Sequence, residues 1–190
     1  MITTHEMESA RGRAAGMIAA AGIPVRAEEL ALIEVADFGM GNLEVEGAQI
    51  LTLYQSQRFG VKLIVMFPGQ TLPEHWHPPV GDDPGKEEVI RVHWGSFAIC
   101  TPGKSRMMMA RPPRGKDGVY TCRSEMVMGP GDQLLIAPGT KHWFQAGPAG
   151  AVVGSYSSVV RDAQDLFTDP AVVRGTVIAA GTVDKTGKRA

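Results

Sequence analysis

The sequence predicts an all-β fold, either a sandwich, a jelly roll or a small barrel, preceded by a helical arm. Its 190 residues, 44% hydrophobic and 21% charged, suffice for one well-buried core and exclude a mostly disordered chain. Glycine and proline are frequent, with 23 and 13 residues, whereas aromatic residues make up only 6%. Short β-rich runs separated by Gly/Pro turns fill most of the chain, which is typical of many short strands and not of a helix bundle.

Residues 1–44 are predicted to form the helical arm. Thr3 and Glu6 have the spacing of a capping box, which starts a helix. Apolar residues then recur at helical spacing: Met7, Ala10, Ala14, Met17, Ile18 and Ala21. The Gly-Ile-Pro segment 22–24 ends this helix, and a second short helix is expected over 27–34. Because the apolar stripe is mostly alanine and methionine, the arm should pack on the main domain or on a partner subunit.

Residues 45–160 are predicted to form the β domain. Its expected strands are Ala48–Gln55, Val61–Phe67, Glu88–Trp94, Phe97–Thr101, Val119–Met126, Gln133–Ile136, His142–Gln145 and Ala151–Val159. The Gly147-Pro148 pair is expected to form a turn between the last two strands. The remainder, residues 161–190, is expected to cover the mouth of the barrel and to end in a flexible polar tail.

Composition and charge exclude several classes of partner. Nineteen Lys and Arg against twenty Asp and Glu give a formal net charge of −1, so no basic face for nucleic acid is predicted. No apolar run is long enough to span a bilayer, so no membrane partner is expected. The first residues lack a signal-peptide pattern, and two cysteines, Cys100 and Cys122, do not make a disulfide framework. We therefore expect a cytoplasmic protein.

Histidines and one glutamate form the most informative pattern. His75 and His77 are two residues apart, and on an extended segment such residues point to the same face. After Glu88, every second residue is apolar: Ile90, Val92 and Trp94. This alternation predicts that Glu88 points inward and that His93 points outward. His142 follows a Pro-Gly turn and is the last candidate.

A shared metal ion explains these inward residues better than separate structural roles do. A single histidine is more often a hydrogen-bonded structural residue than a ligand, and this is our interpretation of His5 and His93. Several unpaired polar groups inside a small barrel would cost about 1–3 kcal/mol each. A divalent ion would satisfy them together. The expected ligands are His75, His77, Glu88 and His142.

The spacing of these residues resembles the first motif of the cupin superfamily, whose fold is a double-stranded β-helix or jelly-roll barrel. Five residues separate Gly69 from His75, and six residues separate Glu88 from Gly95, as in that motif. One departure is the gap between His77 and Glu88, which is much longer than usual.

The second cupin motif is matched by Gly131-Asp132 and by the PGTKH segment 138–142, although Ala146 stands where the motif usually ends in Asn. With these two departures, the sequence resembles the short, single-cupin form of the D-lyxose isomerase family. The resemblance runs over residues 10–172, and its most specific blocks are FPGQTLPEHWHPPV (67–80), GDDPGKEE (81–88), PGTKHWFQAG (138–147) and DLFTDP (165–170).

This resemblance implies a cupin barrel with an N-terminal helical arm that assembles as a homodimer. It implies an aldose–ketose isomerase that converts D-lyxose to D-xylulose through an enediol or enediolate, with D-mannose as a further candidate substrate. It also implies a divalent metal, most often Mn²⁺, although iron, cobalt and zinc accept the same ligands. The ligands carried over from the family are His75, His77, Glu88 and His142.

Five residues are candidates for proton transfer and sugar binding. Lys62 lies in the apolar run VKLIVMF, and a buried lysine can act as an acid–base group, although it can also simply extend to the barrel mouth. Glu88 can transfer protons while it binds the metal. Asp165 is expected to act in catalysis, and Asp169 and Glu74 to bind sugar hydroxyls. For the two aspartates, capping of a helix or turn is the structural alternative.

Two other functions fit the same ligands. One is an iron-dependent cupin dioxygenase, since three histidines and a glutamate also suit iron. The other is a non-catalytic cupin module that binds a metal or a sugar. The charged residues Lys62, Asp165 and Asp169 favour a polyol substrate over the apolar pocket of an oxygenase, and the complete ligand set favours an enzyme over a module.

Overall fold

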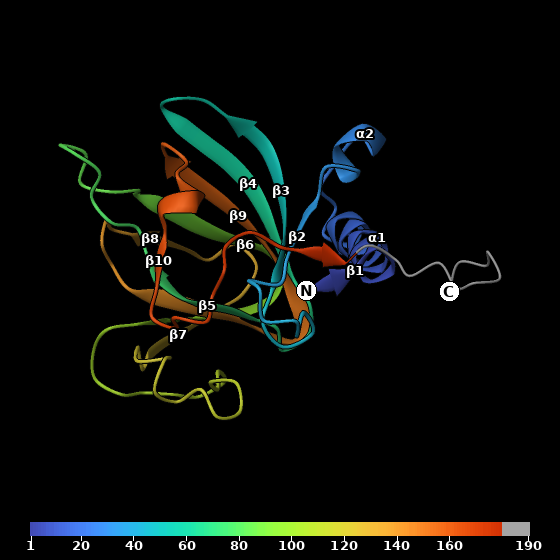
Figure 1. The fold of residues 1–190 in the computed structure, drawn as a ribbon. Coiled ribbons are helices and arrows are strands. Elements are labelled where there is room, and N and C mark those ends of the chain that lie inside the picture. Colours follow the sequence, from blue (N-terminus) through green and yellow to red (C-terminus); the bar gives the residue numbers. More distant parts are fainter. Residues whose placement is uncertain (180–190) are drawn as a thin grey trace.

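The computed structural model describes residues 1–179, which form a curled antiparallel sheet with a helical arm on one side (Figure 1). The elements are β1 (Ile2–Thr3), α1 (Thr4–Ala20), α2 (Ala27–Leu30), β2 (Glu34–Ala36), β3 (Ala48–Gln55), β4 (Phe59–Met66), β5 (Thr71–Trp76), β6 (Glu88–Thr101), β7 (Ser124–Met128), β8 (Gln133–Ile136), β9 (His142–Ser158), the 3₁₀ turn η1 (Asp162–Gln164), β10 (Leu166–Phe167) and β11 (Ile178–Ala179). Within this part of the chain, no helix combines the length and apolar character that a membrane crossing needs.

Strand β9 is the central element of the nine-stranded sheet. Its first part pairs with β5 and β6, and its second part pairs with β4 and β6. The strand order is β10-β5-β9-β4-β3-β2, and β7 and β8 pair with β6. The pairing of β5 with β9 sets His75 opposite His142, two residues that are far apart in the sequence.

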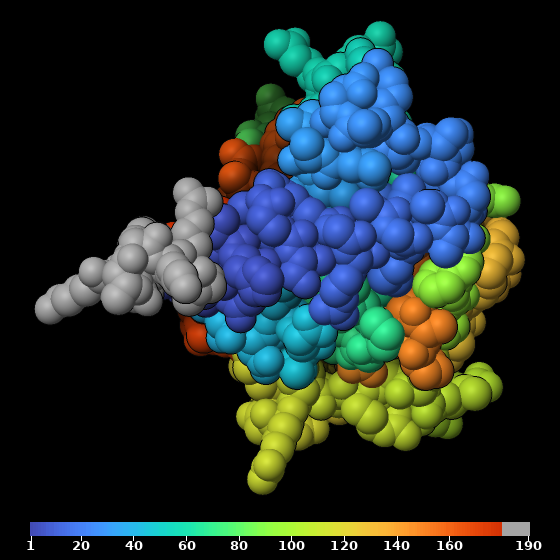
Figure 2. Space-filling view, turned by 90° about the vertical axis from the view of Figure 1, so that its right-hand side faces the viewer, coloured from blue at the N-terminus to red at the C-terminus, as the bar shows by residue number. Residues whose placement is uncertain are grey.

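Alternation along the strands divides the apolar residues between two cores. On β4, Ile64 points into the barrel, whereas its neighbours Leu63 and Val65 point to the outer face. Helix α1 covers this outer face and contributes Ala14 and Ile18 to the second core. Figure 2 shows the helix lying across that face of the molecule. Lys62, two residues before Ile64, therefore points to the inside of the barrel and not toward the arm.

The N-terminal arm begins as predicted but its second helix is shorter. Thr3 Oγ1 accepts from the Glu6 backbone N–H at 3.1 Å, and the Glu6 carboxylate accepts from the Thr3 N–H at 2.7 Å, which confirms the capping box. The expected helix over 27–34 is wrong in its second half, because α2 ends at Leu30. Glu34 already belongs to β2, whose antiparallel pairing with β3 outweighs the weak helical preference of this segment.

In two places, a pair of expected strands is one continuous strand in the structure. The runs 88–94 and 97–101 are both part of β6, with Gly95 at a positive φ of 77° between them. The register shifts between Val92 and Trp94, so Trp94 packs with the outer core and not on the predicted inner face.

The predicted turn at Gly147-Pro148 is also wrong, because the chain continues through it within β9. The pairing of β9 with its neighbours stops at Ala146 and resumes at Ala151. Pro148, which has no N–H to donate, therefore lies at an exposed position outside the ladder, where proline is tolerated.

The expected strand over 119–126 starts only at Ser124. The preceding residues leave the sheet and pack on its outer side, where Tyr120 and Cys122 contact Trp143 in a separate apolar cluster. Burial of these residues thus reflects side-chain packing of a loop and not pairing in a sheet.

The C-terminal segment pairs with two strands that lie far from it in the sequence. Strand β10 pairs with β5, and β11 pairs in parallel with β1. The predicted flexible tail falls mostly on residues 180–190, which lie outside the described residues. The domain division at residues 1–44, 45–160 and 161–190 stays a prediction.

Candidate metal and sugar site

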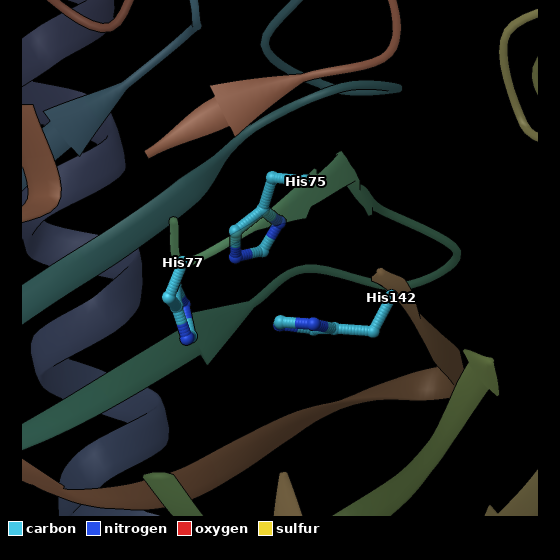
Figure 3. A group of neighbouring side chains, drawn as sticks. All are labelled: His75, His77 and His142. Carbon is cyan, nitrogen blue, oxygen red and sulfur yellow. The ribbon is translucent and has the colours of Figure 1, made fainter. Parts of the chain in front are cut away.

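Three buried histidines meet inside the barrel (Figure 3). His75 lies on β5, His77 follows the end of that strand, and His142 begins the neighbouring strand β9. One ring nitrogen of each lies within 4.8 Å of one from the other two. The strand pairing and the two-residue spacing thus bring together the histidines that the sequence singled out.

Backbone carbonyls determine which ring nitrogen of each histidine is free. His75 Nδ1 lies 2.8 Å from the Pro73 carbonyl oxygen, and His142 Nδ1 lies 2.8 Å from the Thr140 carbonyl oxygen. His77 Nδ1 lies 3.2 Å from the carbonyl oxygen of Lys86. Because a carbonyl only accepts hydrogen bonds, each Nδ1 must carry the proton, which leaves an unshared pair on Nε2 of the neutral ring.

Burial keeps these rings neutral. It lowers the pKa of His75 well below its ordinary value and lowers that of His142 as well, and burial together with nearby Lys86 lowers the pKa of His77 to about 3. His77 Nε2 and His142 Nε2 are buried atoms without a hydrogen-bond partner among the described residues. Two buried, unpaired acceptors side by side are costly unless a cation binds them.

Glu88 adds a carboxylate to the same place. It is the first residue of β6 and is 4% exposed, and it faces inward as the alternation predicted. Its Oε1 accepts a hydrogen bond from Ser155 Oγ, while Oε2 lies 3.5 Å from His77 Nε2. Burial alone would raise the pKa of Glu88, but Lys86, His77 and the Ser155 hydroxyl outweigh it and lower the pKa. An ionised oxygen therefore faces the unshared pair of a neutral imidazole.

These four side chains fit a divalent metal ion. Imidazole nitrogen and carboxylate oxygen are ligands that manganese, iron, cobalt and zinc all accept. A cation between Glu88 Oε2 and the histidine nitrogens would turn the contact of two electron-rich atoms into an attraction. The residues present therefore suit the ion that the sequence motifs suggest, without selecting one metal.

A cavity that His75 and Glu88 help to line has both apolar and charged walls. It is lined by Phe38, Ile50, Lys62, Ile64, Leu72, His75, Lys86, Glu88, Phe144, Ser155, Ser157, Asp162, Asp165, Phe167 and Arg174. The last four of these residues belong to the segment after β9, so this segment closes part of the cavity.

Two lysines in the cavity share one aspartate. Lys62 forms an ion pair with Asp162 Oδ2, and Lys86 Nζ lies 3.4 Å from Asp162 Oδ1. Lys86 Nζ also lies 3.8 Å from Glu88 Oε2. Burial would lower the pKa of Lys86, but Glu88, Asp165 and Asp162 together raise it, so its side chain is an ammonium at neutral pH. Lys86 can therefore donate hydrogen bonds to a sugar oxygen.

Asp165 is the cavity residue whose pKa lies nearest to neutrality. Its Oδ2 lies 3.9 Å from Lys86 Nζ. Burial, supported by the negative charges of Asp162 and Glu88, raises the pKa of Asp165 to about 7 in spite of Lys86. A carboxyl group with such a pKa can both accept and release a proton at neutral pH.

The other two candidates, Glu74 and Asp169, do not line the cavity. Glu74 points to the opposite side of β5 from His75 and bonds Thr121 and Thr168. Asp169 Oδ2 pairs with Lys116 Nζ at 2.9 Å, and Asp169 Oδ1 accepts a hydrogen bond from the Ala171 N–H in the turn that follows.

Sequence reasoning missed three charged residues of the cavity: Lys86, Asp162 and Arg174. Lys86 precedes Glu88 by two residues, and this spacing on an extended chain was the one available signal. Asp162 begins the three-residue turn η1 and Arg174 lies in irregular chain, and neither segment has a periodicity that predicts the direction of a side chain.

The chain is similar in sequence to several sugar isomerases. It is 48% identical over 174 residues to the D-lyxose ketol-isomerase of Cohnella laeviribosi, which covers 91% of this chain and 96% of that one. It is 43% identical over 175 residues to the D-lyxose ketol-isomerase of Thermofilum sp., with 92% and 97% covered. It is also 46% identical over 155 residues to the D-lyxose/D-mannose isomerase of Thermosediminibacter oceani, with 81% and 86% covered.

Solved structures share the fold at much lower identity. The L-ribose isomerase of Acinetobacter sp. DL28 in complex with L-ribose superposes with a TM-score of 0.78 at 16% identity, covering 94% of this chain and 98% of that one. The ligand-free L-ribose isomerase of Cellulomonas parahominis gives 0.76 at 18% identity, with the same coverage. The cupin barrel is thus confirmed. No family model matches the chain. The sequence relatives nevertheless place it unambiguously: the chain belongs to the D-lyxose ketol-isomerase family of aldose–ketose isomerases.

Proposed function

We propose that the protein interconverts D-lyxose and D-xylulose with a divalent metal ion, and that it also accepts D-mannose. One observation carries this proposal. Three neutral imidazoles and the ionised Glu88 converge inside the barrel, and two of these residues, His75 and Glu88, line a cavity whose other walls carry Lys86 and Asp165. The names of the relatives supply the sugar, since the geometry alone does not distinguish one aldose from another.

We assign the metal to His75, His77, Glu88 and His142, and we propose Mn²⁺ as the ion because the family resemblance implies it. When bound there, a divalent ion supplies positive charge that stabilises the negative charge developing on the two sugar oxygens as an enediolate forms. Ser155 holds one oxygen of Glu88 through its hydroxyl, which leaves the other oxygen directed at the histidines.

The proton that moves between C1 and C2 of the sugar needs a carrier with a pKa near neutrality. Asp165 meets this condition, and we assign it as the base that takes the proton from one carbon and returns it to the other. Lys62 is paired with Asp162 and is therefore better suited to fix that aspartate than to act as a base. The ammonium of Lys86 donates hydrogen bonds to the sugar oxygens.

Isomerisation in deuterium oxide tests this function. Protein stripped with a chelator and reloaded with Mn²⁺ should convert D-lyxose to D-xylulose and should place deuterium on the carbon that receives the proton. Reloading with iron, cobalt or zinc ranks the metals, and D-mannose tests the second substrate. Absence of ketose with every metal would contradict the proposal. Oxygen consumption would indicate the dioxygenase instead, and metal binding without turnover would indicate a binding module.

We further propose that the protein is a cytoplasmic homodimer. Both cysteines are free and buried, as suits a reducing compartment. Met126 on β7 and Leu135 on β8 are exposed and line the same surface hollow, and exposed apolar groups that lie together mark an interaction surface. Light scattering should give about twice the chain mass of 20.3 kDa, and a value of one chain mass would contradict the dimer.

A further inference from the structure

Glu74 carries a buried carboxylate whose partners come from three different segments. Its Oε1 accepts from Thr121 Oγ1 and from Thr168 Oγ1, each at 2.7 Å, and its Oε2 accepts from the Cys122 N–H at 2.7 Å. Lys141 Nζ lies 3.9 Å from Oε1. With a side chain of 0% exposure, this carboxylate is fully paired and has no free oxygen for a sugar.

Thr168 is the partner that connects Glu74 to the cavity. It follows β10, in which Phe167 pairs with His75 and Leu166 pairs with Trp76. The Thr168 N–H also donates to the Glu74 carbonyl oxygen at 3.0 Å. Glu74 thus holds Thr168 through both its backbone and its side chain, at the residue next to a proposed metal ligand.

Strand β10 has only two residues, and so short a strand provides little pairing of its own. Asp165 immediately precedes it, so the position of that carboxyl group over the cavity depends on how firmly β10 is held against β5. Loss of the anchor at Thr168 would allow β10 to separate from β5 and Asp165 to move with it.

We propose that Glu74 and Thr168 act together as positioning residues for the isomerase reaction: their contact fixes β10 on β5 and so holds Asp165 at the sugar. This inference rests on the proposed role of Asp165 as the base. A displacement of about 1 Å of a reacting group can cost on the order of 100-fold in rate, so the anchor matters even though it touches no substrate.

Thr121 provides a matched control. It donates to the same oxygen of Glu74 over the same distance as Thr168. Unlike Thr168, it belongs to the loop between β6 and β7, and no described residue of that loop lines the cavity. Removing its hydroxyl costs one equivalent hydrogen bond without releasing β10.

The test compares Thr168→Val with Thr121→Val, and uses Thr168→Ser as the variant that keeps the hydroxyl. Amide hydrogen exchange over residues 165–168 should be about tenfold faster in Thr168→Val and near the parent rate in the other two. With Mn²⁺ and D-lyxose, Thr168→Val should lower kcat by about tenfold or more at a nearly constant KM, because the base is displaced while metal and sugar binding remain.

The two measurements separate this inference from the proposed function. Unchanged exchange in Thr168→Val would overturn the anchor, whether or not the protein is an isomerase. Faster exchange with an unchanged kcat would overturn its link to catalysis, as would an equal loss of kcat in Thr121→Val. If the parent protein converts no sugar, the proposed function fails, and with it the catalytic role, while the exchange rates still decide whether Thr168 holds the segment.

Discussion

Asp165 is the residue whose ionisation should govern the pH dependence of the reaction. Burial raises its pKa to about 7, so the carboxylate that accepts a proton is the major form only above that pH. We expect kcat/KM to fall about tenfold for each pH unit below 7, and to level off above it. Initial rates between pH 5 and 9 at fixed metal concentration measure this dependence.

Asp165→Asn provides the comparison for that profile. The amide cannot accept the proton, so the variant should be slower by a factor of about 100 or more and should lack the acid limb near pH 7. A parent profile that stays level down to pH 5 would exclude Asp165 as the base.

Asp162 has the opposite shift and should contribute to stability. Burial alone would raise its pKa, but Lys86 and Lys62 outweigh burial and lower it to about 2, below the value of about 3.9 for an unfolded chain. A lowered pKa stabilises the folded protein above the unfolded pKa, and this contribution is lost as the pH falls toward 2. Asp162→Asn should therefore lower the free energy of unfolding by about 2 kcal/mol at pH 7.

Urea unfolding at pH 7 and pH 3 checks this expectation. Asp117→Asn serves as the control, since the side chain of Asp117 is 79% exposed and its ion pair with Arg123 should contribute little. Equal free energies of unfolding for the parent and Asp162→Asn at pH 7 would show that the ion pairs of Asp162 with the two lysines do not stabilise the fold.

At the residue level, spacing predicted some site residues and not others. His75 and Glu88 lie on strands and His77 lies on the extended chain just after β5, where alternation fixes the direction of a side chain. Asp162 lies in the short turn η1 and Arg174 in irregular chain, and their places depend on contacts across the molecule that no local pattern records. Glu74 was expected to bind sugar hydroxyls, but it lies on the opposite side of β5 from His75 and bonds Thr121 and Thr168.

At the level of elements, Gly95 explains how β6 can bend and remain one strand. Its φ of 77° lies in the left-handed region, and a Cβ built on it would lie 2.0 Å from the Gly150 carbonyl oxygen. Gly95→Ala should therefore lower the free energy of unfolding by about 2–4 kcal/mol, since neither backbone can easily move. Chemical denaturation of both proteins measures the difference.

Gly129→Ala is the matched substitution for this test. Gly129 lies in the turn between β7 and β8 without a positive φ, and a Cβ there would meet nothing within 4 Å. It should change stability by less than about 0.5 kcal/mol. Similar losses at both glycines would contradict the crowding that the structure shows at Gly95.

Most strands of the barrel were predictable in their centres and not at their joins, whereas β5, which carries His75, was not among the expected strands. Short β-rich runs between turn residues identified β3, β4 and β8 almost to the residue. The predicted strand ends were wrong at these joins because a Gly or Pro residue does not always end a strand. Gly95 and Pro148 instead occupy interruptions of the pairing, which are known only once the neighbouring strands are placed.

At the level of the whole molecule, metal binding should stabilise the fold. Ligands of the ion come from β5, β6 and β9 and from the residue after β5, so an unfolded chain cannot present them together. At 100 times the Kd, a ligand that binds only the folded state adds about 2.7 kcal/mol, which corresponds to an increase in Tm of about 5–10 °C for a chain of this size. Thermal unfolding of stripped protein with and without Mn²⁺ measures this shift.

A chelator in excess should reverse that increase, and Mg²⁺ should produce a smaller one because it prefers oxygen ligands. A Tm that changes with neither Mn²⁺ nor chelator would mean that the histidines hold the fold together without binding a metal.

The closure of the cavity by the segment after β9 is the whole-molecule feature that the sequence only suggested. Its aspartates favoured a place over the barrel mouth, but the pairing of β10 with β5 and of β11 with β1 depends on the finished sheet. Such contacts join residues more than 80 positions apart, beyond the reach of any local pattern.

Calorimetric titration of Mn²⁺ into the stripped protein tests the metal site most directly, with His142→Ala and His93→Ala compared under the same conditions. His93 bonds Tyr156 away from the cavity, so its variant should bind as the parent does, with one ion per chain. His142→Ala should bind at least about 100-fold more weakly, since it removes a proposed ligand. Equal affinity of all three proteins would contradict the assignment of the metal to these histidines.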